Sequence, residues 1–170
     1  MNHDSDLQID IDTLLGIVTL GSPNLPSPNH EFDFTGGALR DVNNRFPGAY
    51  FKDRLFYITA AGNAVTGNSY GNALSSRSSK LSGAATAFTV PARIKKLAYH
   101  SYKSVSGKGV ASGDGIIPVS VAHLEGALQI NLDKVFHAAE LSVAGSWYGS
   151  DGILDQWHSC ILTLLEYLRV

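Results

Sequence analysis

Three short apolar segments, each closed by turn residues, organise the hydrophobic pattern of this 170-residue chain. The first, residues 14–20, is nearly continuous and stops at a Gly-Ser-Pro-Asn turn at 21–24. The second covers residues 55–60, and the third, residues 127–132, alternates apolar and polar positions. Such runs, rich in β-branched residues and bounded by glycine and proline, are typical of buried strands. We therefore predict three strands of a mainly parallel sheet, the first of them covered on both faces.

Two further segments predict helices. Residues 38–46 have the composition of a short helix that ends at the Pro-Gly pair 47–48. Near the end of the chain, Ser150 or Asp151 can cap a longer helix, after which apolar side chains recur at three- and four-residue spacing. Those side chains are Ile153, Trp157, Ile161, Leu164 and Leu168. Strands that alternate with helices indicate an α/β fold.

Residues 62–112 differ from the rest because glycine, serine, asparagine and alanine dominate them. A stretch of this length with weak periodicity is more often a functional excursion or a mobile segment than a compact element. Residues 1–13 are polar and precede the first strand. We expect one partial domain over residues 14–170, with a polar segment before it and a Gly/Ser-rich excursion at about 62–112.

Composition argues against some classes of function and indicates a cellular compartment. The chain carries 13 Lys and Arg against 15 Asp and Glu, a net charge of -2, so we expect no nucleic-acid partner. The single cysteine, Cys160, cannot form an internal disulfide and suits a reducing compartment. Neither a targeting peptide nor a transmembrane segment is visible. These features predict an intracellular protein, in the cytoplasm or a plastid.

Candidate chemistry centres on Asp114, in a Gly-Asp-Gly sequence, and on His137, just after the third strand. Their order and spacing are those of the acid and base of a serine-hydrolase triad, in which a carboxylate orients a histidine that deprotonates a hydroxyl. Each residue alone has a plainer interpretation, since aspartate is common in turns and a lone histidine is often half-buried. His123 is an alternative base, but it precedes the third strand, so we expect it to have a packing or supporting role.

Four motifs, taken in order, resemble lipase-like α/β-hydrolases, and most of all the esterase-like branch of plants, algae and cyanobacteria. They are Val-Thr-Leu-Gly-Ser-Pro at 18–23, Pro-Gly-Ala-Tyr at 47–50, Gly-Asp-Gly-Ile-Ile-Pro at 113–118 with Ala-His-Leu-Glu-Gly-Ala at 122–127, and Trp-Tyr-Gly-Ser at 147–150. The resemblance implies the C-terminal part of an α/β-hydrolase fold, with the last strands of the sheet and flanking helices. It also implies Asp114 as acid, His137 as base, and hydrolysis of carboxylic esters of lipids or small molecules without a cofactor or metal.

The resemblance places the nucleophile on a Gly-x-Ser-x-Gly elbow upstream of the first strand, where about thirteen residues leave no room for it. We therefore expect the chain alone to be inactive, with a first strand that lacks one neighbour and self-associates through its exposed edge. Two alternatives stay open. The chain can be a non-catalytic binding or scaffold module of hydrolase descent. Alternatively, Ser69, in the Gly-Asn-Ser-Tyr-Gly sequence at 67–71, can be the nucleophile of an active hydrolase, although no strand runs directly into it.

Overall fold

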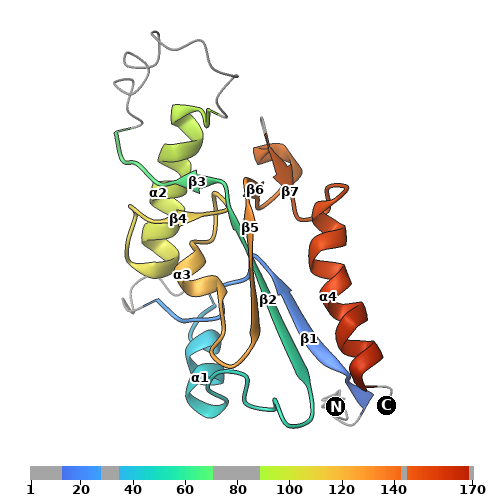
Figure 1. Cartoon of the computed structure of the whole chain (residues 1–170). Helices are drawn as coiled ribbons and strands as arrows, with labels where there is room; N and C mark the ends of the chain where they lie inside the picture. The colour runs from blue at the N-terminus through green and yellow to red at the C-terminus, as the bar shows by residue number, and fades with distance from the viewer. Residues whose placement is uncertain (1–12, 28–34, 71–88, 143–144, 169–170) are drawn as a thin grey trace, which may run out of the picture.

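A parallel sheet of three strands forms the centre of the computed structural model, which describes residues 13–27, 35–70, 89–142 and 145–168. The strands are β1 (Gly16–Leu20), β2 (Phe56–Asn63) and β5 (Leu128–Asp133), in the order β1-β2-β5 (Figure 1). Both pairings are parallel. The predicted α/β class and the three predicted strands are therefore confirmed.

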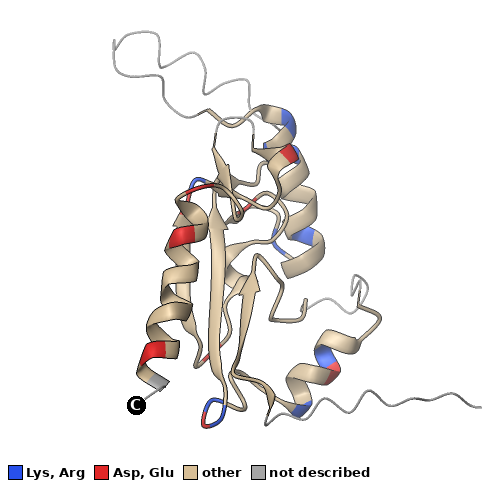
Figure 2. Ribbon diagram, turned by 90° about the vertical axis from the view of Figure 1, so that its right-hand side faces the viewer, with Lys and Arg blue, Asp and Glu red and all other residues tan. Residues whose placement is uncertain are grey.

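Helices flank the sheet on both sides, and they are α1 (Ala38–Arg45), α2 (Ala92–Ser106), α3 (Val119–Ala122) and α4 (Ile153–Leu168). The strands are added in one direction, and parallel crossovers are right-handed, so α1, α2 and α3 lie over the same face. Figure 2 shows this arrangement with the sheet seen from its side. On the opposite face, Ile153 and Trp157 of α4 pack against a buried cluster of Ala60, Leu132, Val135 and Tyr148.

Two small strand pairs extend the structure beyond the carboxyl end of the sheet (Figure 1). β3 (Val65–Thr66) pairs antiparallel with β4 (Ser112–Gly113), and β6 (Val135–Phe136) pairs parallel with β7 (Ser146–Trp147). A 3₁₀ turn, Ala139–Leu141, follows β6. Because Asp114 directly follows β4 and His137 directly follows β6, these pairs bring the two loops to one end of the sheet.

The buried strand is β2, and the prediction that the first strand is covered on both faces is wrong. No side chain of β1 is buried, and Ile17 is 38% exposed. Five consecutive residues of β2, 58–62, are buried instead. Within the described residues β1 bonds only to β2, which makes it an edge strand. At the carboxyl end of its apolar run, Leu20 packs against the same buried cluster as Ile153 and Trp157 of α4, whereas Leu15, at the other end, is 66% exposed.

The second correction concerns residues 62–112, which contain the 15-residue helix α2. This helix buries Ile94, Ala98 and Tyr102 at four-residue spacing, and they form a core cluster with Val65 and Phe136. The glycine and serine content of the whole stretch concealed this period. The interpretation as a segment without a compact element is therefore wrong for α2, while the Ser-rich tract at 75–79 lies outside the described residues.

The two predicted helices, α1 and α4, agree with the hydrophobic pattern, whereas the short helix α3 was not predicted. α1 begins at Ala38, and α4 begins at Ile153 with its predicted apolar stripe partly buried, as far as the side chains are described.

No helix in the described ranges has the length and apolar character needed to cross a membrane. Lys and Arg are scattered over short segments in the view of Figure 2.

Candidate active site

Asp114 lies in a tight turn after β4 and is completely buried, with 0% exposure. Its Oδ1 accepts hydrogen bonds from the backbone N–H groups of Ile116, at 2.9 Å, and Ile117, at 2.7 Å. Gly115 has φ +101°, a conformation that side-chain-bearing residues rarely adopt, so the turn requires glycine after the acid. The turn interpretation of this aspartate therefore accounts for Oδ1 and leaves Oδ2 available to other partners.

His137 supplies one of these partners, because its Nδ1 lies 2.9 Å from Oδ2 of Asp114. A carboxylate only accepts hydrogen bonds, so Nδ1 carries the hydrogen and the neutral ring keeps its lone pair on Nε2. A second bond, from the His137 backbone N–H to the Asp114 carbonyl at 2.9 Å, ties the two loops together. The hydrogen bond with Asp114 raises the pKa of His137 above its usual value, although burial opposes this. The structure thus brings the two predicted residues together, with His137 in the tautomer that a general base would need.

Tyr148, directly after β7, is a second partner of Oδ2; the sequence analysis named it only as part of the motif at 147–150. Its hydroxyl donates to Oδ2 of Asp114 at 3.0 Å and accepts the backbone N–H of Gly62 at 2.7 Å. The indole N–H of Trp157 donates to the Tyr148 carbonyl at 2.9 Å and so links this residue to α4. Burial, together with the negative charge of Asp114, raises the pKa of Tyr148, so its hydroxyl stays protonated as a donor.

Tyr102 of α2 holds the acid's loop from the other side. Its fully buried hydroxyl accepts the backbone N–H of Gly115 at 2.8 Å and donates to the carbonyl of Val65 at 3.1 Å. Burial raises its pKa as well. Tyr102 was not predicted because α2 was not predicted, although the four-residue spacing of Ile94, Ala98 and Tyr102 was an available signal.

Two glycines allow the backbone to approach the acid closely. A Cβ on Gly21, at the end of β1, would lie 2.5 Å from Oδ2 of Asp114 and 2.6 Å from the Tyr148 hydroxyl. Gly62 of β2 is equally enclosed, since a Cβ there would overlap the carbonyl of Val135. The predicted Gly-Ser-Pro turn therefore packs against the candidate acid.

The remaining sequence candidates lie elsewhere. His123 bridges β2 and β5, with Nδ1 2.9 Å from Oγ1 of Thr59 and Nε2 3.1 Å from Oδ1 of Asn131, in keeping with a supporting role. Ser69 lies in a turn after β3, where the N–H of Asn68 donates to the Lys95 carbonyl of α2. No hydrogen bond joins Ser69 to His137 in the described part of the chain. Because residues 71–88 are outside it, the nucleophile role of Ser69 stays a prediction.

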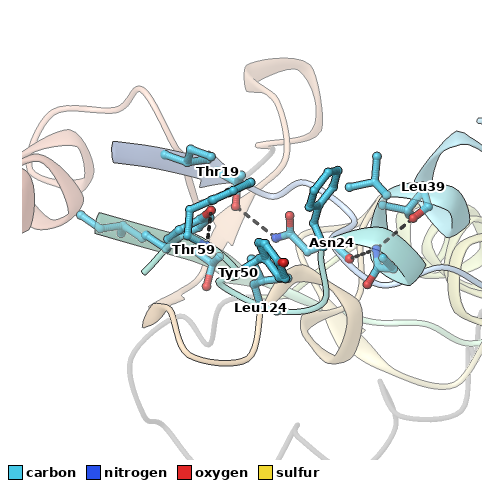
Figure 3. A pocket seen from close by; sticks show the side chains of 14 residues that line it. Thr19, Asn24, Leu39, Tyr50, Thr59 and Leu124 are labelled. Carbon is cyan, nitrogen blue, oxygen red and sulfur yellow. Dashed lines mark hydrogen bonds between the residues drawn. The ribbon is translucent and has the colours of Figure 1, made fainter. Parts of the chain in front are cut away.

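A separate cavity of about 230 Å³ lies between α1, the loop at 48–51 and the first two strands (Figure 3). Its lining contains apolar and aromatic side chains, a few uncharged polar groups and no charged residue. The polar groups have hydrogen-bond partners: the Asn24 amide donates to Thr19 Oγ1 at 3.1 Å and to the Ala122 carbonyl at 2.6 Å, and the Asn43 amide donates to the Asn24 carbonyl at 3.0 Å. Neither Asp114 nor His137 lines this cavity.

Among the residues with described positions, no group of three or more His, Cys, Asp or Glu side chains could hold a metal ion. Comparison with known proteins gives no match, whether with family models, with curated proteins or with solved structures. What the chain does is therefore inferred from its own residues.

Proposed function

We propose that Asp114 and His137 are the acid and base of a hydrolase that cleaves carboxylic esters of lipids or small molecules. The supporting observation is the 2.9 Å contact between Nδ1 of His137 and Oδ2 of a fully buried Asp114. In this mechanism Nε2 takes a proton from an attacking hydroxyl and returns it to the leaving alcohol. Asp114 holds the tautomer and stabilises the imidazolium that forms.

The proposed architecture is the C-terminal part of an α/β-hydrolase, with β1, β2 and β5 as the last strands of its sheet. Two features support it. Asp114 follows an excursion after β2, and His137 follows β5 and β6, so both residues lie at the carboxyl end of the sheet. The side chain of His137 is 36% exposed, so its ring reaches the surface while the acid does not.

The proposal places the attacking hydroxyl outside the described residues. The hydrogen bonds recorded for His137 go to the carboxylate and the carbonyl of Asp114, and none of them involves a serine or threonine hydroxyl. A single Gly-x-Ser-x-Gly sequence is present, at 67–71. Within the described residues, His137 therefore has no hydroxyl hydrogen-bonded to it, and we expect the chain to hydrolyse esters only slowly.

The test uses the 170-residue chain, a fluorophosphonate probe and p-nitrophenyl esters. We expect no stoichiometric probe labelling, and we expect added methanol, acting as a substitute nucleophile, to accelerate ester cleavage. Because His137 would deprotonate the methanol, the methanol-dependent rate should fall roughly 100-fold in His137→Ala. Asp114→Asn should lower it as well, because the tautomer is then wrong. Equal methanol-dependent rates in wild type and His137→Ala would contradict the proposal.

Ser69→Ala is the matched control in the same experiment. If Ser69 supplies no nucleophile, its removal changes neither labelling nor the methanol-dependent rate. Stoichiometric labelling that disappears in Ser69→Ala and in His137→Ala would instead identify an active hydrolase that uses Ser69.

The uncharged cavity beside α1 favours a second candidate function, a non-catalytic binding module. Its volume of about 230 Å³ exceeds the roughly 150 Å³ of a cavity that binds benzene, so it suits a small neutral, mainly apolar ligand. Chemical-shift changes at Leu39 and Tyr50 on addition of such ligands, with no rate that depends on His137, would support this candidate over the hydrolase.

A further inference from the structure

The carboxylate of Asp114 has two ends with different partners. Oδ1 accepts two backbone N–H groups of its own turn, whereas Oδ2 accepts Nδ1 of His137 and the hydroxyl of Tyr148. The two donors on Oδ2 are almost equally distant, at 2.9 and 3.0 Å. The charge on this one oxygen is therefore shared between the candidate base and a phenol.

Tyr148 is held so that it can donate its hydrogen in one direction. The Tyr148 oxygen accepts the N–H of Gly62 at 2.7 Å, and its own hydrogen is donated to Oδ2 of Asp114. The ring is 5% exposed and meets the ring of His137 edge-on, with centroids 6.4 Å apart and an interplanar angle of 89°. These contacts leave the phenol little freedom to leave the carboxylate.

We infer that Tyr148 is a positioning residue for the Asp114–His137 pair, whose hydroxyl shares Oδ2 with the imidazole and thereby limits the charge that the imidazole receives. The inference rests on the proposed acid–base function and deepens it. A charge-assisted hydrogen bond weakens when its acceptor serves a second strong donor. Tyr148 thus holds the acid in place and also keeps the histidine from binding its proton too tightly to release it to a leaving group.

The other ionisable groups near this centre have weaker claims. Tyr102 bonds to the backbone of Gly115 and not to the carboxylate. Glu140, on the 3₁₀ turn after His137, is exposed. Within the described residues, the ionisable side chains that contact the His137 ring are those of Asp114 and Tyr148.

The test follows the titration of the His137 ring nitrogens by NMR in the ¹⁵N-histidine-labelled chain. Tyr148→Phe removes the competing donor, so we expect the His137 midpoint to rise by about 0.5 pH unit. Replacement of Tyr148 by 3-fluorotyrosine keeps the shape and strengthens the donor, so the midpoint should fall by a few tenths of a unit. Tyr102→Phe is the matched control, because it removes a buried phenol beside the same turn without removing a bond to Oδ2. It should leave the midpoint within about 0.2 unit.

Two results would overturn the inference: midpoints unmoved by both Tyr148 replacements, or the same shift in Tyr102→Phe as in Tyr148→Phe. If Tyr148→Phe does not fold, the 3-fluorotyrosine chain decides alone by the direction of its shift. Asp114→Asn separates this inference from the proposed function. A His137 midpoint that does not respond to Asp114→Asn means that the acid–base pair itself is absent. A midpoint that responds to Asp114→Asn but not to Tyr148 replacement removes only the role of Tyr148.

Discussion

The two ends of the central sheet differ in how completely their side chains are buried and hydrogen-bonded. At the carboxyl end, Asp114 is fully buried, and each of its carboxylate oxygens accepts two hydrogen bonds. At the amino end, three large apolar side chains at the start of β1 are 39%, 66% and 38% exposed, and these are Leu14, Leu15 and Ile17. The molecule thus concentrates its burial where a charge is held and leaves open a surface that a neighbour could cover.

This difference predicts how the two ends respond to substitution. A buried charge with satisfied partners is costly to disturb, because each partner left behind loses its bond without gaining water. An exposed apolar residue can change with little cost to the fold. Stability should therefore depend strongly on the closed carboxyl end, and association should depend on the open amino end.

The largest effect is expected for Asp114→Ala. Two backbone N–H groups, the Tyr148 hydroxyl and the His137 ring would then lack their acceptor in a buried site. We expect the free energy of unfolding to fall by about 4 kcal/mol, or roughly 10 °C in Tm. Urea and thermal unfolding measure this, with Asp155→Ala, at an exposed position of α4, as the control that should cost about 0.5 kcal/mol. Equal losses in the two variants would contradict the contrast.

Gly21→Ala tests the same end of the sheet by crowding it. Gly21 has φ +55°, and a Cβ there would press on Oδ2 of Asp114 and on the Tyr148 hydroxyl. Backbone strain and overpacking together should lower the free energy of unfolding by about 3 kcal/mol. Gly152→Ala is a close control, because Gly152 has φ +75° but no atom within 4 Å of its would-be Cβ. It should cost about 1 kcal/mol from strain alone, and a similar cost at both glycines would show that the acid is not tightly enclosed.

A smaller effect is expected in the pH dependence of stability. The hydrogen bond with Asp114 raises the pKa of His137 in the folded chain, so the folded state binds this proton more tightly than the unfolded state does. The resulting stabilisation is complete below the unfolded pKa of about 6.5 and is lost as the pH rises through the folded pKa. Solvent weakens the effect, because the His137 side chain is 36% exposed.

The measurement compares Tm of wild type and His137→Gln across this range. The difference should be largest near pH 6 and should shrink towards alkaline pH. His158→Gln, at an exposed position of α4, serves as the control and should show no such trend. A Tm difference between wild type and His137→Gln that stays constant or grows with pH would give the wrong sign for a bond between imidazolium and carboxylate.

The sequence could predict what depends on local pattern. The strands β1, β2 and β5 and the helices α1 and α4 follow from runs and periods within about fifteen residues, and turn residues mark their ends. Asp114 and His137 could be paired because their order relative to the strands places both residues at the carboxyl end of the sheet. That they meet at 2.9 Å is a finding of the structure.

What could not be predicted depends on contacts between distant segments. The bond between Tyr148 and Gly62 joins residues 86 positions apart, and the need for glycine at Gly21 arises from side chains of two other loops. No local period signals such contacts. The edge position of β1 was expected only from the family resemblance, and its exposure was not expected at all, since an apolar run looks the same in a central strand and in an edge strand with one bonded neighbour.

The smallest effect on stability is expected at the open end, where Leu15→Lys should change the free energy of unfolding by no more than about 0.5 kcal/mol. Its effect should appear in association instead. Leu15 is 66% exposed beside the edge of β1 that pairs with no strand among the described residues, and a lysine there should hinder a second copy from pairing with that edge. The sedimentation coefficient, measured by sedimentation velocity, and the fluorescence of a hydrophobic dye should both decrease in Leu15→Lys. Val110→Lys, at a 71% exposed position away from β1, should alter neither. If both lysines act alike, general surface charge explains the result, and the amino end of β1 has no special affinity for a neighbour.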